Sequence, residues 1–254
     1  MVRKTFTMKQ NIKEKYFEKI RKKVGHTIYK YSLISENDHI MIALSGGKDS
    51  LVMLEILSAF RKYFPLKYKL TACHVLAKGV EYDVNKNYLE EFCKKNEVDL
   101  FFREISVNLK RNPKKHPCFV CSWQRRKKLF EICREFKCNK LAFGHHMNDA
   151  IETLFLNMIY HGSISSLPQK VDFFNGEIKI IRPLLQLNEK DISMYAQYKD
   201  LKKELKSCGF ENKSKRSDIK NYIKEIEKYH PRAKINIFRS MDNIYTNYLP
   251  KKIK

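Results

Sequence analysis

The sequence lacks long runs of apolar residues. No uninterrupted apolar stretch approaches the roughly 18 to 20 residues that a membrane-spanning helix needs. The first segment, MVRKTFTMKQNIKEKYFEKI, also lacks the apolar core of a secretory signal. An organellar targeting peptide would share its basic character, but Glu14, Glu18 and the scarcity of Arg and Ser disfavour one. We therefore expect a soluble, cytoplasmic protein with no membrane partner.

A disulfide framework is also lacking. The chain has seven cysteines, an odd number, and it carries no export signal that would take it to an oxidising compartment. We expect reduced thiols, some of them structural and some available as metal ligands.

Acidic residues are few. The chain has 28 Asp and Glu against 51 Lys and Arg, which gives a formal net charge of +23 spread along the whole length. This excess favours a polyanionic partner such as a nucleic acid. The alternative is compositional, because lysine is simply common in proteins that are rich in Lys, Asn, Ile, Tyr and Phe together, as those of AT-rich genomes are.

Internal repeats and low-complexity linkers are absent too, so we expect one α/β domain with additions. Residues 8–31 have the pattern of a basic amphipathic helix, which could lie on the core, contact RNA, or do both. The final third is helical in pattern and very basic. The three predicted segments are an N-terminal helix at 1–31, a central domain at 32–187 and a helical extension at 188–254.

Apolar runs and amphipathic segments alternate through the central domain. Strands are expected at 40–44, 68–77, 99–107 and 140–144, and helices at 50–60, 83–96, 119–136 and 149–160. The segment FFNGE predicts a hairpin turn before IIRPLLQL. This alternation predicts an α/β fold with a Rossmann-like, doubly wound parallel sheet.

The segment IALSGGKDSLVMLEIL, residues 42–57, places a glycine turn between a buried strand and a helix. Gly46 and Gly47 allow the backbone to approach a ligand, and the amides of the turn and of the helix N-terminus converge on an anion. A plain tight turn would explain the glycines but not the polar residues around them. We therefore predict a phosphate site.

Two common nucleotide motifs do not fit this turn. The pattern G-x-x-x-x-G-K-[ST] needs glycine where the chain has Ile42 and Ser or Thr where it has Asp49, and G-x-G-x-x-G is absent. The turn instead resembles the PP-loop of the ATP pyrophosphatase superfamily, whose members cleave ATP between the α- and β-phosphates. By this resemblance Asp49 helps to position Mg²⁺, and the pyrophosphate is held by Ser45, Gly46, Gly47, Lys48, Asp49 and Ser50.

Cys118 and Cys121 stand at C-x-x-C spacing in HPCFVCSWQRRKKLFEIC, in a loop expected to enter a helix. The basic residues around them favour the thiolate form, and two thiolates at this spacing can hold one metal or one iron–sulfur cluster. Cys208, in a polar basic segment, is a candidate third ligand. Three cysteines would leave one iron of a [4Fe–4S] cluster open to carry an exogenous sulfide.

A zinc site made of Cys118, Cys121, Cys133 and Cys138 is the alternative. Cys133 falls on the apolar face of a predicted helix, which favours a small core residue instead. Cys73 and Cys93 are expected in the core for the same reason.

The segment GHHMNDAIETLFLNMIYHG follows a predicted strand. Its residues His145, His146, Asn148 and Asp149 lie where loops of the superfamily meet ATP. Solvent exposure or local capping would also explain the histidines, and Asp149 could be the N-cap of the next helix.

Together, these motifs resemble the tRNA 2-thiocytidine synthetases, the TtcA family. In order and spacing the match covers about residue 20 to 250 and includes LSGGKDS, the C-x-x-C, the GHH segment, IIRPLL, Cys208 and the closing NIFRSMDNIYTNYLP. The resemblance implies an ATP-dependent and iron–sulfur-dependent thiolase that acts on cytidine 32 of the tRNA anticodon loop. ATP would adenylylate the cytosine C2 oxygen, and sulfide would attack C2 and expel AMP.

The same resemblance implies the site residues and the partners. The cofactors are ATP, Mg²⁺ and a [4Fe–4S] cluster, and the partners are tRNA and a sulfur donor, either a cysteine desulfurase or free sulfide. A homodimer is left open. The ATP-binding set is the six turn residues with His145 and His146, the cluster ligands are Cys118, Cys121 and Cys208, and the catalytic set is these three cysteines with Asp49 and Asp149.

Two positions depart from the family's pattern. The family's loop commonly reads G-H-H-x-D-D, whereas here Asn148 replaces the first acid, and the partner in a second C-x-x-C is Glu211. These changes put the modified nucleotide in doubt. They leave open another PP-loop tRNA enzyme, either a uridine thiolase or a lysidine-type ligase. An RNA-binding protein with a degenerate loop is a third alternative.

Overall fold

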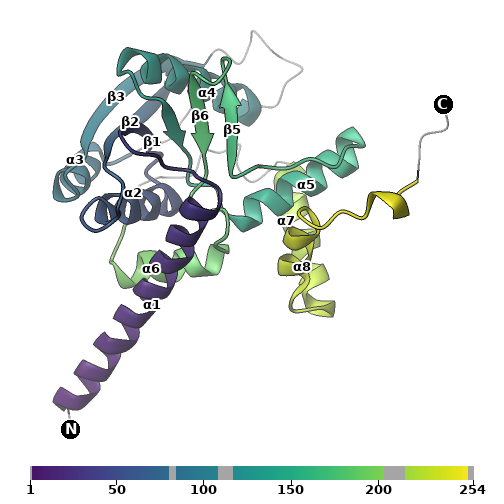
Figure 1. Ribbon diagram of the computed structural model, residues 1–254, viewed down its shortest axis with the longest axis horizontal. Coiled ribbons are helices and arrows are strands. Elements are labelled where there is room, and N and C mark those ends of the chain that lie inside the picture. The colour runs from purple at the N-terminus through teal and green to yellow at the C-terminus, as the bar shows by residue number, and fades with distance from the viewer. Residues whose placement is uncertain (1, 80–83, 108–116, 203–214, 251–254) are drawn as a thin grey trace. The chain divides into compact units, whose positions relative to one another are not determined.

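The computed structural model describes residues 2–79, 84–107, 117–202 and 215–250, with side chains from residue 13 onward (Figure 1). The chain forms two compact units. Unit 1 comprises Met1–His146 and Pro168–Asn212, and unit 2 comprises Met147–Leu167 and Lys213–Lys254. The units divide the chain differently from the three segments expected from the sequence, because the N-terminal helix belongs to unit 1 and a central helix belongs to unit 2.

Unit 1 is built on a six-stranded sheet in the order β3-β2-β1-β4-β6-β5. All neighbouring strands are parallel except β5 and β6, which form the predicted hairpin. Phe174, Asn175 and Gly176 all have positive φ there, which suits Asn and Gly. The strands are β1 Asp38–Ala43, β2 Tyr68–Lys78, β3 Asp99–Ser106, β4 Lys140–Ala142, β5 Lys170–Phe173 and β6 Ile178–Ile181.

Helices cover both faces of this sheet, which confirms the predicted doubly wound α/β class. In β1, Ile40 and Ile42 belong to a core cluster that also contains residues of α1, α2, α3 and α6, whereas Met41 belongs to a second cluster with residues of α4. Successive side chains of a strand point to opposite faces, so the two clusters are the two faces. The helices are α1 Val2–Lys30, α2 Lys48–Phe60, α3 Lys86–Lys95, α4 Pro117–Glu135 and α6 Glu189–Tyr198.

The apolar stripe of α1 lies in the core of unit 1. Ile20, Val24 and Ile28 are at most 1% exposed, which confirms that this helix packs on the domain. A polar cluster joins the same helix to α2 and α6, since Arg21 pairs with Glu55 at 3.1 Å and Glu55 accepts a hydrogen bond from the buried Tyr195.

A buried ion pair closes the amino edge of the sheet. The Nζ of Lys140 lies 2.5 Å from an oxygen of Asp38, and both side chains are 4% exposed. Lys140 also donates to the carbonyl of Leu33 at 2.8 Å, and Asn139 donates to Asp38 at 2.8 Å. Burial lowers the pKa of Lys140 from its ordinary value, and the Asp38 carboxylate opposes this shift. The pair ties the start of β4 to the chain that enters β1.

Unit 2 is helical. Its helices are α5 Met147–His161, α7 Lys215–Tyr229 and α8 Ala233–Ser240, followed by the 3₁₀ turn η2 Thr246–Tyr248. The helices meet around an apolar cluster of Met147, Ile151, Ile219 and Ile223. Helical structure was expected in the C-terminal third, but the packing of α5 against it was not.

Across the described ranges of both units, every helix is too short or too polar to cross a membrane.

Candidate active site

Two loops meet at the carboxyl edge of the sheet in unit 1. The strands β1 and β4 are neighbours, while β2 continues the sheet on the far side of β1 and β6 on the far side of β4. In open α/β sheets such a change of direction leaves a crevice outside the carboxyl ends of the strands, where ligands bind. The glycine turn follows β1 and the two histidines follow β4, so the fold brings these predicted segments to one crevice.

The glycine turn is braced by its own serines. Gly46 has φ +83°, a conformation that favours glycine. Ser45 accepts a hydrogen bond from the Gly47 amide at 3.2 Å, and the buried Ser50 hydroxyl donates to the Gly47 carbonyl at 2.9 Å and lies 3.1 Å from the Ser45 hydroxyl. The structure therefore shows the two serines stabilising the loop, whereas the sequence resemblance gave them pyrophosphate contacts.

The N-terminus of α2 is open to an anion. Gly47 is the N-cap residue and supplies no side-chain cap. The first amides of a helix point outward along its axis, and the helix dipole favours a negative charge there. The turn thus fits a phosphate or pyrophosphate group.

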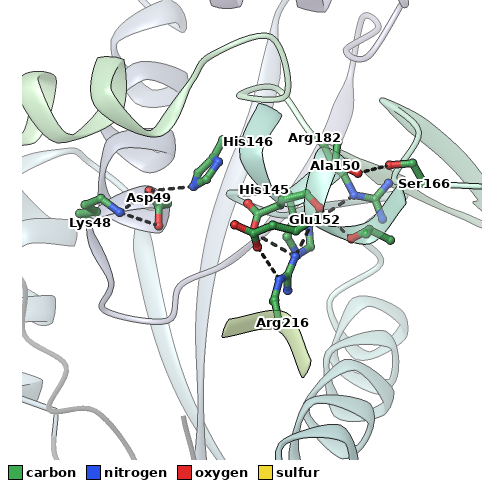
Figure 2. Close-up of polar contacts among 11 residues, drawn as sticks. Lys48, Asp49, His145, His146, Ala150, Glu152, Ser166, Arg182 and Arg216 are labelled. Atoms are coloured by element: carbon green, nitrogen blue, oxygen red, sulfur yellow. Dashed lines mark hydrogen bonds and ion pairs between the residues drawn. The ribbon is translucent and has the colours of Figure 1, made fainter. Parts of the chain in front are cut away.

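Lys48 lies between two carboxylates at this turn. Its Nζ is 3.2 Å from Oδ1 of Asp49 and 3.6 Å from Oε1 of Glu189. On the other side of Asp49, the Nε2 of His146 lies 3.8 Å from the same Oδ1 (Figure 2). His146 is buried and Asp49 is half-buried. The predicted residues Lys48, Asp49 and His146 therefore do come together, and Glu189 joins them from the first turn of α6.

Gly144 allows the two loops to touch. A Cβ at this position would lie 3.0 Å from both the carbonyl carbon and oxygen of Asp49 and 3.1 Å from the nitrogen of Ser50. These distances are tighter than most real Cβ contacts, and the atoms that would have to shift are backbone. Glycine therefore allows the loop after β4 to approach the loop after β1 without such a shift.

The second histidine, His145, is held by a buried arginine. Arg182, directly after β6, donates from Nε to Nδ1 of His145 at 3.3 Å and from Nη1 to the carbonyl of Pro168 at 2.5 Å (Figure 2). A guanidinium can only donate, so Nδ1 of His145 is the acceptor. In this arrangement the ring is neutral, with its proton on Nε2.

His74 supports the backbone at the entry to the glycine turn. It lies on β2, is 1% exposed, and its Nδ1 donates to the carbonyl of Leu44 at 2.8 Å. Burial lowers its pKa to about 4, with a smaller contribution from the positive charges of Arg125 and Lys86. The ring is consequently neutral near pH 7.

Cys118 and Cys121 lie in the first two turns of α4, not in a preceding loop. The helix begins at Pro117, two residues before the predicted start at 119, because proline suits the first helical position. Both thiols are half-buried, and Cys121 packs against Ala77 and Val107 at the carboxyl ends of β2 and β3. The pair is therefore at the same edge of the sheet as the glycine turn. A helix N-terminus stabilises thiolates, so the pair suits a metal or cluster. Cys208, the third predicted ligand, lies outside the described residues.

The alternative zinc site is wrong. Cys133 and Cys138 are at most 4% exposed in an apolar cluster with Met41 and Leu141. Burial raises the pKa of both thiols, that of Cys138 to about 12, so they stay protonated. Among the residues that the structure describes, no three His, Cys, Asp or Glu side chains form a metal-binding group. Cys73 and Cys93 are also buried, as expected.

Asp149 belongs to unit 2. It lies in the first turn of α5, which starts at Met147, so it is not the N-cap residue. One of its oxygens is 3.2 Å from Nη2 of Arg216, and the Nε of Arg216 lies 2.7 Å from Glu152 one turn further along (Figure 2). In the same unit Ser166 donates to the carbonyl of Ala150 at 2.6 Å and fixes the chain that leaves α5. Asn148, which replaces an acid of the family's pattern, is buried.

Four residues of the site were not singled out from the sequence as site residues: His74, Gly144, Arg182 and Glu189. Two of them had a usable signal. Gly144 comes two residues after β4 and Arg182 directly after β6, and the ends of apolar strands are where ligand loops of α/β sheets begin. Nothing in the local sequence marks His74 or Glu189, because their roles depend on contacts between distant segments.

A doubly wound sheet with a phosphate turn after its first strand, and a histidine loop beside it, defines a nucleotide-binding α/β protein of the PP-loop class. A family model described as PP-loop domain matches residues 12–227.

Curated relatives narrow the family. A tRNA-cytidine(32) 2-sulfurtransferase of Geobacter metallireducens is 32% identical over 94% of this chain and 94% of its own length. One of Aliivibrio fischeri is 34% identical over 91% of this chain and 76% of its own length. The chain therefore belongs to the tRNA-cytidine(32) 2-sulfurtransferase family of PP-loop ATP pyrophosphatases, which confirms the resemblance seen in the sequence.

A solved structure has the same fold. The U34-tRNA thiolase NcsA from Methanococcus maripaludis, determined with its [4Fe–4S] cluster, superposes with a TM-score of 0.74 and 25% identity, over 95% of this chain and 82% of that one.

Proposed function

We propose that this protein is an ATP-dependent tRNA sulfurtransferase that converts cytidine 32 of tRNA to 2-thiocytidine. One observation carries the proposal: within unit 1 the phosphate turn after β1 and the accessible cysteine pair on α4 lie at the same edge of one sheet. ATP activation and sulfur delivery are the two halves of thiolation. The family relatives act on cytidine 32 by name, which supports the choice of base.

The reaction depends on cleavage of ATP between its α- and β-phosphates. The C2 oxygen of cytosine attacks the α-phosphorus, and pyrophosphate leaves. Sulfide then adds to C2, the C2–O bond breaks, and AMP departs with the former carbonyl oxygen, so the base gains sulfur with no net oxidation or reduction. The amides at the start of α2 and Lys48 bind the departing pyrophosphate. Asp49 would help to ligate Mg²⁺ on the phosphates, as the resemblance implies.

The remaining residues of the crevice position these groups. His146 and Glu189 orient Asp49 and Lys48 at the distances found here. Arg182 fixes the ring orientation of His145, which the resemblance counts among the ATP-binding residues. Asp149 remains a candidate catalytic carboxylate in the role implied by the resemblance.

A [4Fe–4S] cluster suits the cysteine pair. Cys118 and Cys121 would supply two ligands and Cys208 the third, and such a cluster has one iron free to hold sulfide for the attack on C2. The cluster in the solved U34-tRNA thiolase supports this assignment. The sulfide would come from a cysteine desulfurase or from the free pool, and the enzyme would act in the cytoplasm.

A uridine thiolase is the second candidate. It is favoured by the likeness to the U34-tRNA thiolase and by Asn148, which changes the family's loop. Both candidates share the ATP and sulfur chemistry and differ in the base that enters the crevice.

The cluster is tested by anaerobic purification with iron and sulfide analysis. We expect a brown protein whose absorbance is lost in Cys118→Ala, Cys121→Ala and Cys208→Ala. Cys93→Ala, which removes a thiol buried in the core, should keep the colour. A colourless protein that holds zinc and no iron would refute the sulfur-delivery half of the proposal, and thiolation that survives the triple cysteine change would refute the role of the thiols.

A further inference from the structure

A groove of 650 Å³ runs along α1 in unit 1. Apart from Gln186 and Thr27, its lining consists of charged and titratable side chains of α1: Lys15, Glu18, Lys19, Lys22, Lys23 and His26. Four lysines against one glutamate give this lining a net positive charge, so the groove suits a ligand of negative sign.

The lysines of this groove form a row. Lys15, Lys19 and Lys22 are four and three residues apart, so they lie on one side of the helix. At 1.5 Å per residue their Cα atoms are about 6 Å and about 4.5 Å apart along the helix axis. The opposite side of α1 holds Ile20 and Val24 in the core, so the row is fixed on a rigid element.

This row carries net positive charge, because Glu18, one turn from Lys15 and Lys22, offsets only part of it. Lys23 pairs with Asp191 at 3.0 Å. By contrast, no carboxylate of the described residues lies within 4.0 Å of the ammonium of Lys15, Lys19 or Lys22. Like charges one turn apart on a helix repel each other by roughly 0.2–0.5 kcal/mol per pair. A partner of opposite charge would relieve this repulsion.

The groove is next to the phosphate turn. Asp191, in the first turn of α6, pairs with Lys23 of the groove and accepts a hydrogen bond from Tyr16 of α1 at 3.0 Å through its carbonyl. Glu189, in the same turn, lies 3.6 Å from Lys48. One turn of α6 therefore contacts both the groove and the ATP-binding lysine.

We propose that this groove binds the sugar–phosphate backbone of the substrate RNA, outside the ATP site; the inference rests on the proposed function. A row of ammonium groups with no apolar pocket recognises repeated phosphates without reading bases. A membrane surface would need the apolar side of α1, which is buried. The groove thus holds the backbone of the RNA while a separate part of the RNA reaches the crevice.

The test is the salt dependence of tRNA binding to the full-length protein, without ATP. In the triple variant Lys15→Gln, Lys19→Gln, Lys22→Gln, we expect the slope of log K against log salt to fall by about 2 to 3, and affinity near 0.1 M salt to fall at least about tenfold. ATP affinity should not change. The triple Lys→Arg variant, which keeps the charges, should retain the slope.

A matched control removes three lysines elsewhere. Lys67, Lys94 and Lys95 are exposed at the amino edge of the sheet, before β2 and at the end of α3, and their triple change to Gln alters the net charge equally. We expect its slope to change by less than about 1. If the two Gln variants had equal salt slopes and the wild type still thiolated tRNA, the groove would not be an RNA-binding site, and the proposed function would stand. Absence of thiolation by the wild type would instead overturn the proposed function.

Discussion

Gly144 approaches the backbone of Asp49 so closely that even a methyl group there would require the backbone to shift. A Cβ on Gly144 would lie 3.0 Å from the carbonyl carbon and oxygen of Asp49. The contact joins the loop after β4 to the first turn of α2, where ATP would bind. The crevice should therefore be sensitive to one methyl group.

Gly144→Ala should weaken ATP binding at least about tenfold, or about 1.4 kcal/mol, because backbone and not a flexible side chain must move. Isothermal titration with ATP measures this. Gly25→Ala is the matched control: its Cβ would meet only the ring of Phe60 at 3.7 Å, within a helix. That variant should bind ATP normally. Its free energy of unfolding should rise by up to about 1 kcal/mol, because alanine favours a helix more than glycine does. Normal ATP affinity in Gly144→Ala would show that the loops can separate at no cost.

Replacing Arg182 should release the ring of His145. In the wild type, nitrogen NMR shifts should show Nδ1 of His145 without a proton and Nε2 with one. In Arg182→Met, which has no donor, the ring should populate both tautomers, and the carbonyl of Pro168 loses its donor at a cost of about 1–3 kcal/mol of stability. Arg182→Lys, which keeps a donor, should be intermediate. A protonated Nδ1 in the wild type would contradict this arrangement.

Acid should destabilise the fold through His74. Its folded pKa, about 4, is below the ordinary value of 6.5, so the unfolded chain binds more protons between these values, and stability falls as pH falls through that range. Between pH 7 and pH 5 the loss should be about 2 kcal/mol. Urea unfolding of the wild type and of His74→Asn at both pH values isolates the contribution of His74 to this loss of stability. An equal pH dependence in the two proteins would exclude His74 as its source.

The buried pair of Lys140 and Asp38 should support stability and not ATP binding. Lys140→Met leaves a buried carboxylate without its ammonium partner, so the free energy of unfolding should fall by about 3–5 kcal/mol. The double variant with Asp38→Asn should recover part of that loss, because no buried charge remains. Thermal unfolding and ATP titration of both variants provide the comparison. If Lys140→Met were as stable as the double variant, the carboxylate of Asp38 would have to be solvated once its partner is removed.

Local sequence patterns account for most of unit 1. Apolar runs such as IMIAL locate the strands, and the glycine turn between β1 and α2 gives the phosphate site, because both depend on neighbouring residues only. The start of α4 was placed too late: Pro117, suited to a first helical position, was treated as part of a loop.

Long-range contacts account for what the sequence did not reveal. The pairing of Lys48 with Glu189 joins segments far apart in the chain, and no local pattern connects them. The assignment of α5 to unit 2 likewise depends on Ile151 meeting Ile219 and Ile223. An apolar helix face shows that a helix is packed, but it does not show which partner it packs against.

Mass spectrometry of tRNA nucleosides tests the central claim most directly. Anaerobically purified protein is incubated with ATP, Mg²⁺, sulfide and tRNA from cells that lack the gene, and the digested RNA is analysed by position. The account predicts 2-thiocytidine at position 32, with one AMP formed per sulfur added and none in the Cys118→Ala variant. Thiouridine in its place would support the second candidate, and ATP cleavage that leaves every nucleoside without sulfur would contradict the account.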